Sequence, residues 1–268
     1  MQYKMEIEKI FAESIKRGNV SRFLYRYRPI NENTLEELKD NYLFFSSWQQ
    51  FNDPFDGRVS INVSYTYEEV FLYFWKLNEK MGFPKNMNEI SIKAKELSEK
   101  DGWFNQVLEQ VLKEFNKVVR VCCFSKVNDS ILMWSHYSKS HEGVCLEFDC
   151  LQDPMTFFIP NPIQYVKDYP QLSFLDDSKE LIRRLISHKF DGWKYEKEHR
   201  IFKYPLSENK VFYKPQALKS IIFGCKSSEQ TRNKVKDALS NSHNVTFKEC
   251  KLSNNSYKLN IVELPTNF

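Results

Sequence analysis

A block of helical periodicity at 66–117 interrupts a chain whose other segments carry short strand patterns. Inside this block, apolar residues recur at helical spacing in three runs, at 67–80, 88–99 and 102–117. The block reads as an insertion between two β-rich parts, and no Ser/Gly-rich linker flanks it. The sequence therefore predicts an α+β protein with a split, mostly antiparallel β core, formed as a single domain over 1–268 with a helical insertion.

The stretch from Gly192 to Lys203 predicts a strand with charged residues on one side. Trp, Tyr, Ile and Phe favour a pleated surface, and a period of two residues then puts Glu196, Glu198 and Arg200 on one face. Neighbouring carboxylates raise each other's pKa and a guanidinium lowers it, so the pKa values of Glu196 and Glu198 would depend on both neighbours. The alternative is an edge strand with a solvated, salt-bridged face.

The low glycine content argues against the commonest phosphate-binding loops. Only 7 of the 268 residues are glycine, and the chain contains neither a P-loop nor a G-x-G-x-x-G motif. A Walker-type or Rossmann-type mechanism is therefore disfavoured. Aromatic residues make up 15% of the chain and supply many flat faces for packing or stacking. The net charge of +4 permits a nucleic-acid partner without requiring one.

The cysteine pattern and the lack of long apolar runs predict a cytoplasmic protein. The six cysteines form no C-x-x-C pair, as expected of free thiols in a reducing compartment. Residues 1–18 lack the apolar core of a secretory signal. No run approaches the roughly 20 apolar residues that a membrane span needs, so we expect no membrane partner.

Two arginines form a candidate anion clamp. In the strand pattern at 22–28, Arg26 and Arg28 share one face with Leu24, and Pro29 ends the strand. A guanidinium can grip a phosphate bidentately, which suits both side chains to a phosphate-bearing ligand. The alternative is a solvated strand face.

Serines at the ends of two strands are candidates for holding a catalytic carboxylate. Ser46 and Ser47 end a Phe-Phe strand, and Ser125 ends the run Cys-Cys-Phe-Ser. Each hydroxyl could donate a hydrogen bond to a carboxylate. Each could equally satisfy local backbone groups and end its strand, which is the commoner use of serine at such positions.

Two segments contain side chains of metal-binding type. In the hexapeptide Phe-Asn-Asp-Pro-Phe-Asp, Asp53 and Asp56 could bind a metal ion, but an Asx turn anchored by two phenylalanines is favoured. His136 and His141 are five residues apart, so on a helix they do not share a face for zinc. If the helix ends between them they could converge with Cys145. A histidine that donates a hydrogen bond at a cleft wall, or a structural histidine, is favoured over a ligand.

Seven short motifs follow one another along the chain between residues 22 and 226. They are LYRYRP at 24–29, FSS at 45–47, FNDPFD at 51–56, CFS at 123–125, MWSHYSKSHEGVCLEF at 133–148, WKYEKEHR at 193–200 and IIFGC at 221–225. Together these motifs resemble those of a widespread bacterial domain family of unknown function, whose members often occur in mobile or phage-defence neighbourhoods. The resemblance implies a family without implying a reaction.

The order of four elements is also similar to that of ADP-ribosyltransferases of the Arg, Ser, Glu-x-Glu type. An arginine on the first strand, a helix at 34–40, a serine-containing strand and Glu196-x-Glu198 follow one another in that order. This resemblance implies a β core of the ADP-ribosyltransferase type and NAD as the substrate. It also implies a cleft where the strand carrying Arg26 and Arg28 meets the strand carrying the two glutamates.

The same resemblance implies a role for each site residue. Glu198 would stabilise the oxocarbenium ion that forms when the nicotinamide bond breaks, and Glu196 would orient or deprotonate the acceptor. Ser46 or Ser47, with Ser125 as a rival, would position Glu198. Arg200 has no fixed role in this pattern. The residues expected to bind the cofactor are Arg26, Arg28, Tyr27, Trp48, His136, Tyr137 and Arg200.

We therefore expect an enzyme that transfers ADP-ribose from NAD to RNA, DNA or protein. Such an enzyme would act as a toxin or phage-defence effector, with a neutralising antitoxin as a further partner. The first rival is a metal-dependent nuclease that uses Asp53, Asp56 and Glu196, although Glu198-x-Arg200 stands where a Glu-x-Lys would be needed. The second rival is a non-catalytic module that binds a nucleotide or another ligand in the same cleft.

Overall fold

The structure is a computed structural model, and it describes residues 2–61, 64–172, 178–206, 208–239 and 245–265. The chain groups into two compact units, which are described separately below. Unit 1 comprises Met1–Ser47, Val119–Tyr165 and Asp191–Phe268, and unit 2 comprises Trp48–Val118 and Val166–Phe190. The predicted single domain with an insertion stays a prediction.

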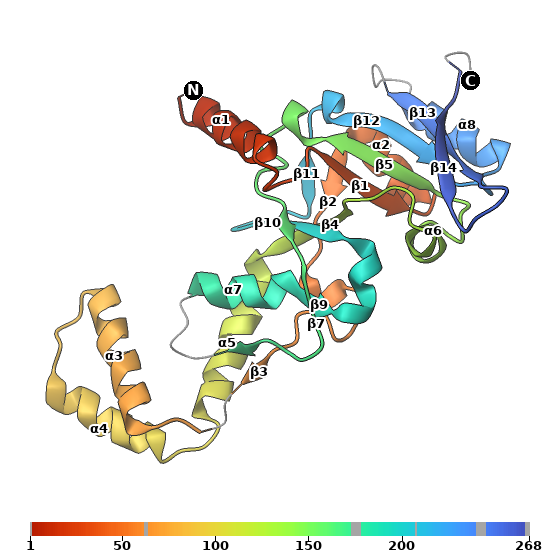
Figure 1. The fold of residues 1–268 in the computed structure, drawn as a ribbon. Coiled ribbons are helices and arrows are strands. Elements are labelled where there is room, and N and C mark those ends of the chain that lie inside the picture. The colour runs from red at the N-terminus through yellow and green to blue at the C-terminus, as the bar shows by residue number, and fades with distance from the viewer. Residues whose placement is uncertain (1, 62–63, 173–177, 207, 240–244, 266–268) are drawn as a thin grey trace. The chain divides into compact units, whose positions relative to one another are not determined.

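Unit 1 is built on an eight-stranded sheet (Figure 1). All neighbouring strands in it are antiparallel except β12 and β13, which are parallel and joined through helix α8. In spatial order the strands are β14 (Leu259–Glu263), β13 (Thr246–Leu252), β12 (Leu218–Phe223), β5 (Val144–Asp149), β1 (Phe23–Arg28), β4 (Arg120–Ser125), β10 (Glu198–Lys203) and β6 (Asn161–Pro162).

The predicted α+β class with a mostly antiparallel sheet is confirmed. The predicted split of the β core is not observed, because the strands of the core form one continuous sheet. β5 pairs with β1 on one side and with β12 on the other, so it joins the two groups of strands into one sheet. A separate two-stranded ladder in unit 1 consists of β2 (Tyr42–Phe44) and β11 (Lys210–Phe212).

The helices of unit 1 begin and end at residues with recognisable capping chemistry. The Asn31 side chain accepts from Thr34 N at the start of α2, and Asn41 ends that helix in the left-handed region at φ 54°. At the start of α8 the Ser228 side chain accepts from Thr231 N. The helical elements are α1 (Gln2–Lys16), α2 (Glu32–Asp40), α6 (Ile131–Tyr137) and α8 (Glu229–Ala238), with 3₁₀ turns η2 (Cys150–Gln152), η3 (Asp191–Glu196) and η4 (Pro215–Ala217).

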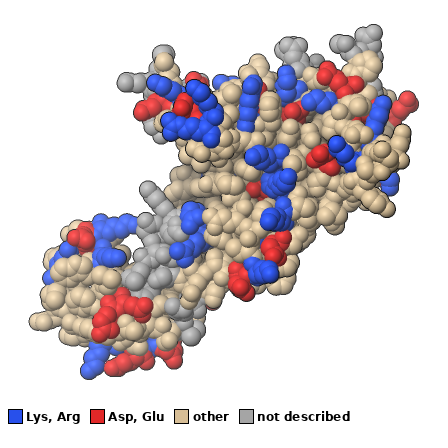
Figure 2. All heavy atoms as spheres, viewed as in Figure 1, with Lys and Arg blue, Asp and Glu red and all other residues tan. Residues whose placement is uncertain are grey.

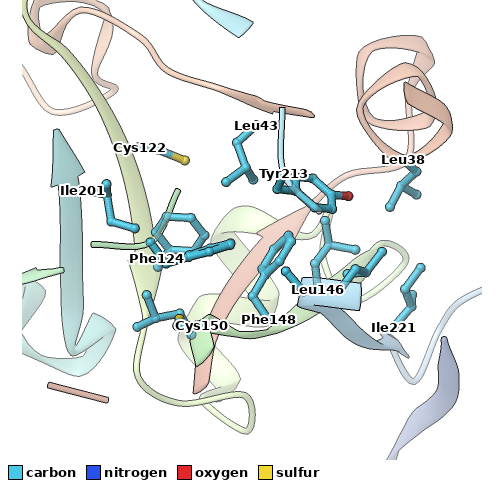
Figure 3. Packing of buried hydrophobic residues seen from close by; sticks show 14 of the residues in the cluster. Leu38, Leu43, Cys122, Phe124, Leu146, Phe148, Cys150, Ile201, Tyr213 and Ile221 are labelled. Atoms are coloured by element: carbon cyan, nitrogen blue, oxygen red, sulfur yellow. The ribbon is translucent and has the colours of Figure 1, made fainter. Parts of the chain in front are cut away.

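The sheet buries a different hydrophobic core on each face. Leu146 and Phe148 of β5 belong to a large core that also receives Leu38 of α2 (Figure 3). Cys145 immediately precedes Leu146 in β5 and belongs to a second, smaller core with Trp134 of α6. Because successive side chains of a strand point to opposite faces, the two cores lie on opposite sides of the sheet. We call these sides the α2 face and the α6 face.

Unit 2 contains the predicted helical block. The three predicted helices are confirmed to within one residue at each end as α3 (Tyr67–Met81), α4 (Met87–Ser98) and α5 (Trp103–Val118). Tyr65, Val70, Ala94, Trp103 and Phe104 form their shared core. Unit 2 also contains η1 (Trp48–Gln50), β3 (Ser60–Ile61), β8 (Gln171–Leu172), α7 (Ser178–Ser187) and β9 (His188–Phe190), while β7 (Gln164–Val166) spans the division between the units.

The prediction of one strand over 192–203 is wrong in its first half. Residues Asp191–Glu196 form the 3₁₀ turn η3, Lys197 has φ 43°, and only Glu198–Lys203 form a strand. Two contacts hold the turn: Ser125 Oγ donates to Glu196 O at 2.6 Å, and Lys126 N donates to Lys197 O at 3.0 Å. Tertiary contacts therefore override the strand preference of the aromatic residues in this segment.

Candidate functional site

Five residues of unit 1 gather at the end of β4 on the α6 face, and we call them the carboxylate site: Ser125, Tyr137, Glu196, Glu198 and Arg200. Strand β4 lies between β1 and β10, and Ser125 is paired with Glu198 across the ladder. Residues directly opposite each other in an antiparallel pair project from the same face. Helix α6 and turn η3 contact each other at this site, which brings Tyr137 to Glu196.

Glu198 and Arg200 form a buried, bidentate ion pair. Arg200 Nε donates to Glu198 Oε1 at 2.6 Å, and Arg200 Nη2 donates to Oε2 at 3.1 Å. Their side chains are 5% and 1% exposed. The prediction that Glu198 and Arg200 share a strand face is therefore confirmed, and the solvated edge strand is not what the structure shows. A guanidinium that engages both oxygens fixes the plane of the carboxylate.

Glu196 reaches the same site from the 3₁₀ turn rather than from the strand. Its side chain is buried, and Oε1 accepts a hydrogen bond from Tyr137 Oη at 2.6 Å. Ser125 Oγ donates to the backbone carbonyl of Glu196. Glu196 and Glu198 thus belong to one site, but the turn at Lys197 corrects the prediction that a common strand face carries them.

Four half-buried or exposed rings of α6 and η3 form a cluster that includes Tyr137, the hydrogen-bond donor to Glu196. His136 is exposed on α6, and its ring centroid lies 6.4 Å from Trp193 and 6.2 Å from Tyr195. Trp193 and Tyr195 are themselves 6.0 Å apart, and Tyr137 adjoins His136 at 6.4 Å. Aromatic faces near carboxylates form a suitable surface for a planar cation.

Two neighbours of Glu198 were missed by the sequence analysis. Cys123 stands opposite Arg200 in the ladder, where burial and then the Glu198 carboxylate hold the pKa of its thiol well above the usual range. Tyr165 Oη accepts from Glu198 N at 2.8 Å. Alternation along Cys-Cys-Phe-Ser would have placed Cys123 on the face of Ser125, whereas nothing in the sequence indicates Tyr165.

Arg26 and Arg28 do not reach this site, which corrects the predicted cleft. Arg26 Nη1 donates to Glu37 Oε2 at 3.1 Å and Arg28 Nη2 donates to Oε1 at 3.0 Å, so one buried carboxylate of α2 holds both. Arg26 is paired with Leu146, a residue of the α2-face core, and Tyr25 next to it is paired with Ser125. The two arginines therefore lie on the α2 face, opposite to Glu198.

The serine that the fold places beside Glu198 is Ser125. Ser46 pairs with Val121, which is four residues along β4 from Ser125. At about 3.3 Å per residue this is roughly 13 Å, too far for a hydrogen bond between Ser46 and Glu198. The Ser46 assignment is therefore wrong. Ser47 is the last residue of the first segment of unit 1, and its assignment stays a prediction.

Of the two other predicted stacking rings, Tyr27 is a core residue. It is 6% exposed, its hydroxyl donates to Val127 O at 2.9 Å, and its ring meets Trp134 edge-on at 5.2 Å. Tyr27 is therefore part of the α6-face core, which corrects the prediction that its ring stacks on a cofactor. Trp48 is half-buried and belongs to unit 2, and its assignment stays a prediction.

The residues considered as metal ligands have other partners. Asp53 Oδ1 accepts from Phe55 N at 2.9 Å, which confirms the Asx turn. His141 Nε2 lies 3.0 Å from Ser135 Oγ, and its ring stacks on Trp134. In the part of the chain that the structure describes, no group of three or more His, Cys, Asp or Glu residues is arranged to hold a metal ion.

Two further features concern the cysteines and the helices. All six cysteines are free thiols. No helix in the described ranges has the length and apolar character needed to cross a membrane.

A second buried carboxylate on the α6 face, Glu147, accepts from Ser220 Oγ and from Lys248 Nζ at 2.6 Å.

In comparison with known proteins, part of the chain matches the model of a family of unknown function. Residues 133–201 match the model of the family described as Protein of unknown function (DUF2971). The predicted resemblance to a family of unknown function is thereby confirmed. No curated protein and no solved structure matches the chain. The matched segment contains Tyr137, Glu196, Glu198 and Arg200, but not Ser125.

Proposed function

We propose, for a chain whose residues 133–201 match a family of unknown function, that the carboxylate site binds NAD and transfers its ADP-ribose to a macromolecular acceptor. The observation that carries this proposal is the convergence of two glutamates and a serine beside a cluster of aromatic rings. These residues come from β4, α6, η3 and β10. A core of the ADP-ribosyltransferase type is part of the same proposal.

The chemistry of NAD suits this surface. The nicotinamide ring of NAD is planar and positively charged, and aromatic faces attract cations by roughly 0.5–2 kcal/mol. His136, Trp193 and Tyr195 supply such faces, and His136 adjoins Tyr137, whose hydroxyl donates to the Glu196 carboxylate. This support concerns the nicotinamide end of NAD. The groups that would hold the phosphates are not Arg26 and Arg28, whose guanidinium groups are paired with Glu37.

In the proposed reaction, the bond between the ribose C1′ and the nicotinamide nitrogen breaks, and its electron pair leaves with neutral nicotinamide. Glu198 stabilises the positive charge that develops on the ribose, with Arg200 fixing the orientation of the carboxylate. The acceptor then forms a bond to C1′ and loses its proton to Glu196. Ser125 positions Glu196 through its backbone carbonyl.

One observation favours a second candidate, a non-catalytic module that binds a nucleotide without turnover. Arg200 engages both oxygens of Glu198, so its positive charge offsets the charge that would stabilise the ribose cation. A pair of this kind is also a common structural device in a protein interior. Binding of NAD without release of nicotinamide would identify this second function.

The experiment is to measure release of nicotinamide from NAD by the full-length protein and by a Glu196→Gln variant. Glutamine keeps the shape of Glu196 and can accept from Tyr137, so the variant should fold while losing the proton acceptor. Because Glu196 takes the proton of the acceptor, we expect the acceptor-dependent rate of nicotinamide release to fall by roughly 10²-fold or more in this variant. The matched control is Glu147→Gln, which alters another buried carboxylate of the α6 face outside the site. Equal rates in wild type and Glu196→Gln, or no release at all, would reject the proposed transfer.

The acceptor class is identified in the same experiment by adding RNA, DNA or cell protein with labelled NAD. The face of the molecule in Figure 2 carries both Lys/Arg and Asp/Glu side chains, so surface charge does not single out a nucleic acid. If the protein acts as a toxin or phage-defence effector, its expression in bacteria should slow growth and the Glu196→Gln variant should not. A neutralising antitoxin would restore growth when co-expressed.

A further inference from the structure

A pocket in unit 2 is built around the Phe-Asn-Asp-Pro-Phe-Asp turn, which the proposed function does not use. It has a volume of about 440 Å³, within the roughly 300–1,000 Å³ typical of small-molecule sites. The lining residues all belong to unit 2, and the inference does not rest on the proposed function. They are Phe55, Arg58, Val166, Lys167, Asp168, Tyr169, Pro170, His188, Lys189 and Phe190.

The turn holds Phe55 and Arg58 at the pocket wall. Asp53 Oδ1 accepts from Phe55 N, and Arg58 N donates to Phe55 O at 3.2 Å. Arg58 Nε donates to Pro54 O at 3.2 Å, which anchors the guanidinium by one nitrogen. Gly57 has φ 71°, and a Cβ there would lie 3.2 Å from Trp48 Cδ1. These hydrogen bonds order the turn and position the side chains of Phe55 and Arg58 at the pocket wall.

Aromatic side chains of the lining are exposed to an extent that packing alone does not explain. Phe55 is 63% exposed, Tyr169 47% and Phe190 54%. Three large rings from three separate segments line one pocket while much of their surface stays in contact with water. Such rings provide stacking surfaces for a planar group.

The charges of the lining favour an anion. Arg58, Lys167 and Lys189 supply three cationic groups against the single carboxylate of Asp168. Arg58 and Lys167 are exposed, and neither forms an ion pair with another residue in the described ranges. His188 Nδ1 donates to Arg184 O at 2.9 Å, which fixes the orientation of the ring in the lining.

We propose that this pocket binds a nucleoside phosphate. The base stacks on the rings of Phe55, Tyr169 and Phe190, and the phosphate is bound by Arg58 and Lys167. The combination of stacking rings with cations that can bind phosphate is the pattern used for nucleotides and for single strands of nucleic acid. The shared ligand chemistry is a planar base carrying a phosphate, either free or as one unit of a single strand.

The test is isothermal titration of the full chain with AMP, adenosine and inorganic phosphate, in wild type and in two variants. Loss of stacking in Phe55→Ala should weaken AMP binding about fivefold or more. Loss of the guanidinium in Arg58→Gln should weaken it about tenfold. Adenosine should bind more weakly than AMP, and its affinity should respond to Phe55→Ala but not to Arg58→Gln. The affinity for inorganic phosphate should fall in Arg58→Gln and stay unchanged in Phe55→Ala.

Two matched controls in unit 2 are Phe83→Ala and Lys113→Gln. Phe83 is 56% exposed and Lys113 is exposed, and neither lines the pocket. Both should bind AMP as the wild type does. Equal AMP affinity in wild type, Phe55→Ala and Arg58→Gln would overturn the proposal, as would no AMP binding at millimolar concentration together with no binding of the oligonucleotide below.

A short single-stranded RNA of six adenylates distinguishes the two sources of the ligand. If the strand binds at least tenfold more tightly than AMP and is weakened by the same two variants, the pocket recognises a nucleotide within nucleic acid. If AMP binds and the strand does not, the ligand is a free nucleotide. If the strand binds but neither Phe55→Ala nor Arg58→Gln affects it, the strand binds elsewhere and the proposal fails.

Discussion

Arg26 and Glu198 lie on opposite faces of one sheet, although only strand β4 separates their strands. Tyr25 and Glu198 both pair with Ser125, one from each side, so these three residues share the α6 face. Arg26, one position after Tyr25, must then point to the α2 face, where Glu37 binds it. Any function of Glu198 is therefore performed without Arg26 or Arg28.

The first prediction concerns Glu37, which holds both arginines. Its side chain is 3% exposed, and replacing it with glutamine leaves two guanidinium groups without their counter-charge. Removing one partner of a buried ion pair typically costs roughly 3–5 kcal/mol, so Glu37→Gln should lower the free energy of unfolding by about 3 kcal/mol. Urea denaturation measures this change.

Glu36 provides the matched control for Glu37. It forms an exposed ion pair with Lys210, so Glu36→Gln should leave the midpoint of denaturation almost unchanged. A Glu37→Gln protein that is as stable as the wild type and that binds phosphate more tightly would contradict the structural role. It would also show that Arg26 and Arg28 are available to a ligand.

The second prediction concerns the coupling between Glu198 and Arg200. Glu198→Gln and Arg200→Met should each destabilise the protein by roughly 3–5 kcal/mol, because each leaves a buried charge without its partner. The double variant should be more stable than the sum of the two effects predicts, because it buries no uncompensated charge. A double-mutant cycle by chemical denaturation measures the coupling, and additive effects would show that the pair contributes nothing.

The third prediction concerns stability between pH 5 and pH 8. Burial lowers the pKa of His199 and of His141, the latter also through nearby Lys226. For His199, Lys126 acts in the same direction as burial, while the Lys197 carbonyl and Glu198 oppose it. The unfolded chain then takes up protons near pH 6.5 that the folded chain does not, so stability is complete above that pH and falls as the pH drops toward the folded pKa values.

Measuring the free energy of unfolding at pH 8, 6.5 and 5.5 checks this direction. His199→Gln should reduce the loss between pH 8 and pH 5.5, because glutamine does not titrate. Carboxylates whose pKa is lowered, such as Asp149 beside Arg22, lose their contribution only at lower pH and do not interfere in this range. An unchanged loss in the His199→Gln protein would mean that His199 does not cause it.

The local parts of the fold could be predicted from the sequence. Alternation along β1 correctly separates Tyr25 and Tyr27 from Arg26 and Arg28, because the two-residue period is a property of a single strand. The helices of unit 2 follow from apolar spacing and from breaks at glycine and proline. The Asx turn at Asp53 follows from side-chain chemistry within four residues.

The candidate site could not be predicted in the same way, because it depends on register between strands. Tyr25 shares a face with Glu198 because both residues pair with Ser125 on β4. A shift of one residue in the pairing of β1 with β4 would place Arg26 on that face instead. The partner of Arg26 is likewise fixed by the packing of α2 on the sheet, which brings Glu37 to it. Neither fact is encoded in the spacing of any one motif.

The last prediction tests the turn between Glu196 and Glu198, where the sequence and the structure differ most. Lys197 is exposed and has φ 43°, in the left-handed region that glycine adopts without strain and a β-branched residue adopts only at a cost. Lys197→Gly should therefore change the free energy of unfolding by less than about 0.5 kcal/mol, because relief of strain offsets the greater freedom of the unfolded chain. Lys197→Val should lower it by roughly 1–2 kcal/mol.

A continuous strand through Lys197 would give the opposite ranking, since valine favours a strand and glycine weakens it. Thermal denaturation of the two variants beside the wild type decides between these conformations. The ranking also bears on the site itself, because the turn at Lys197 is what separates the Glu196 carboxylate, held by Tyr137, from the Glu198 carboxylate, held by Arg200. If valine proved the more stable variant, the two glutamates would be expected on one strand face and Tyr137 would lose its partner.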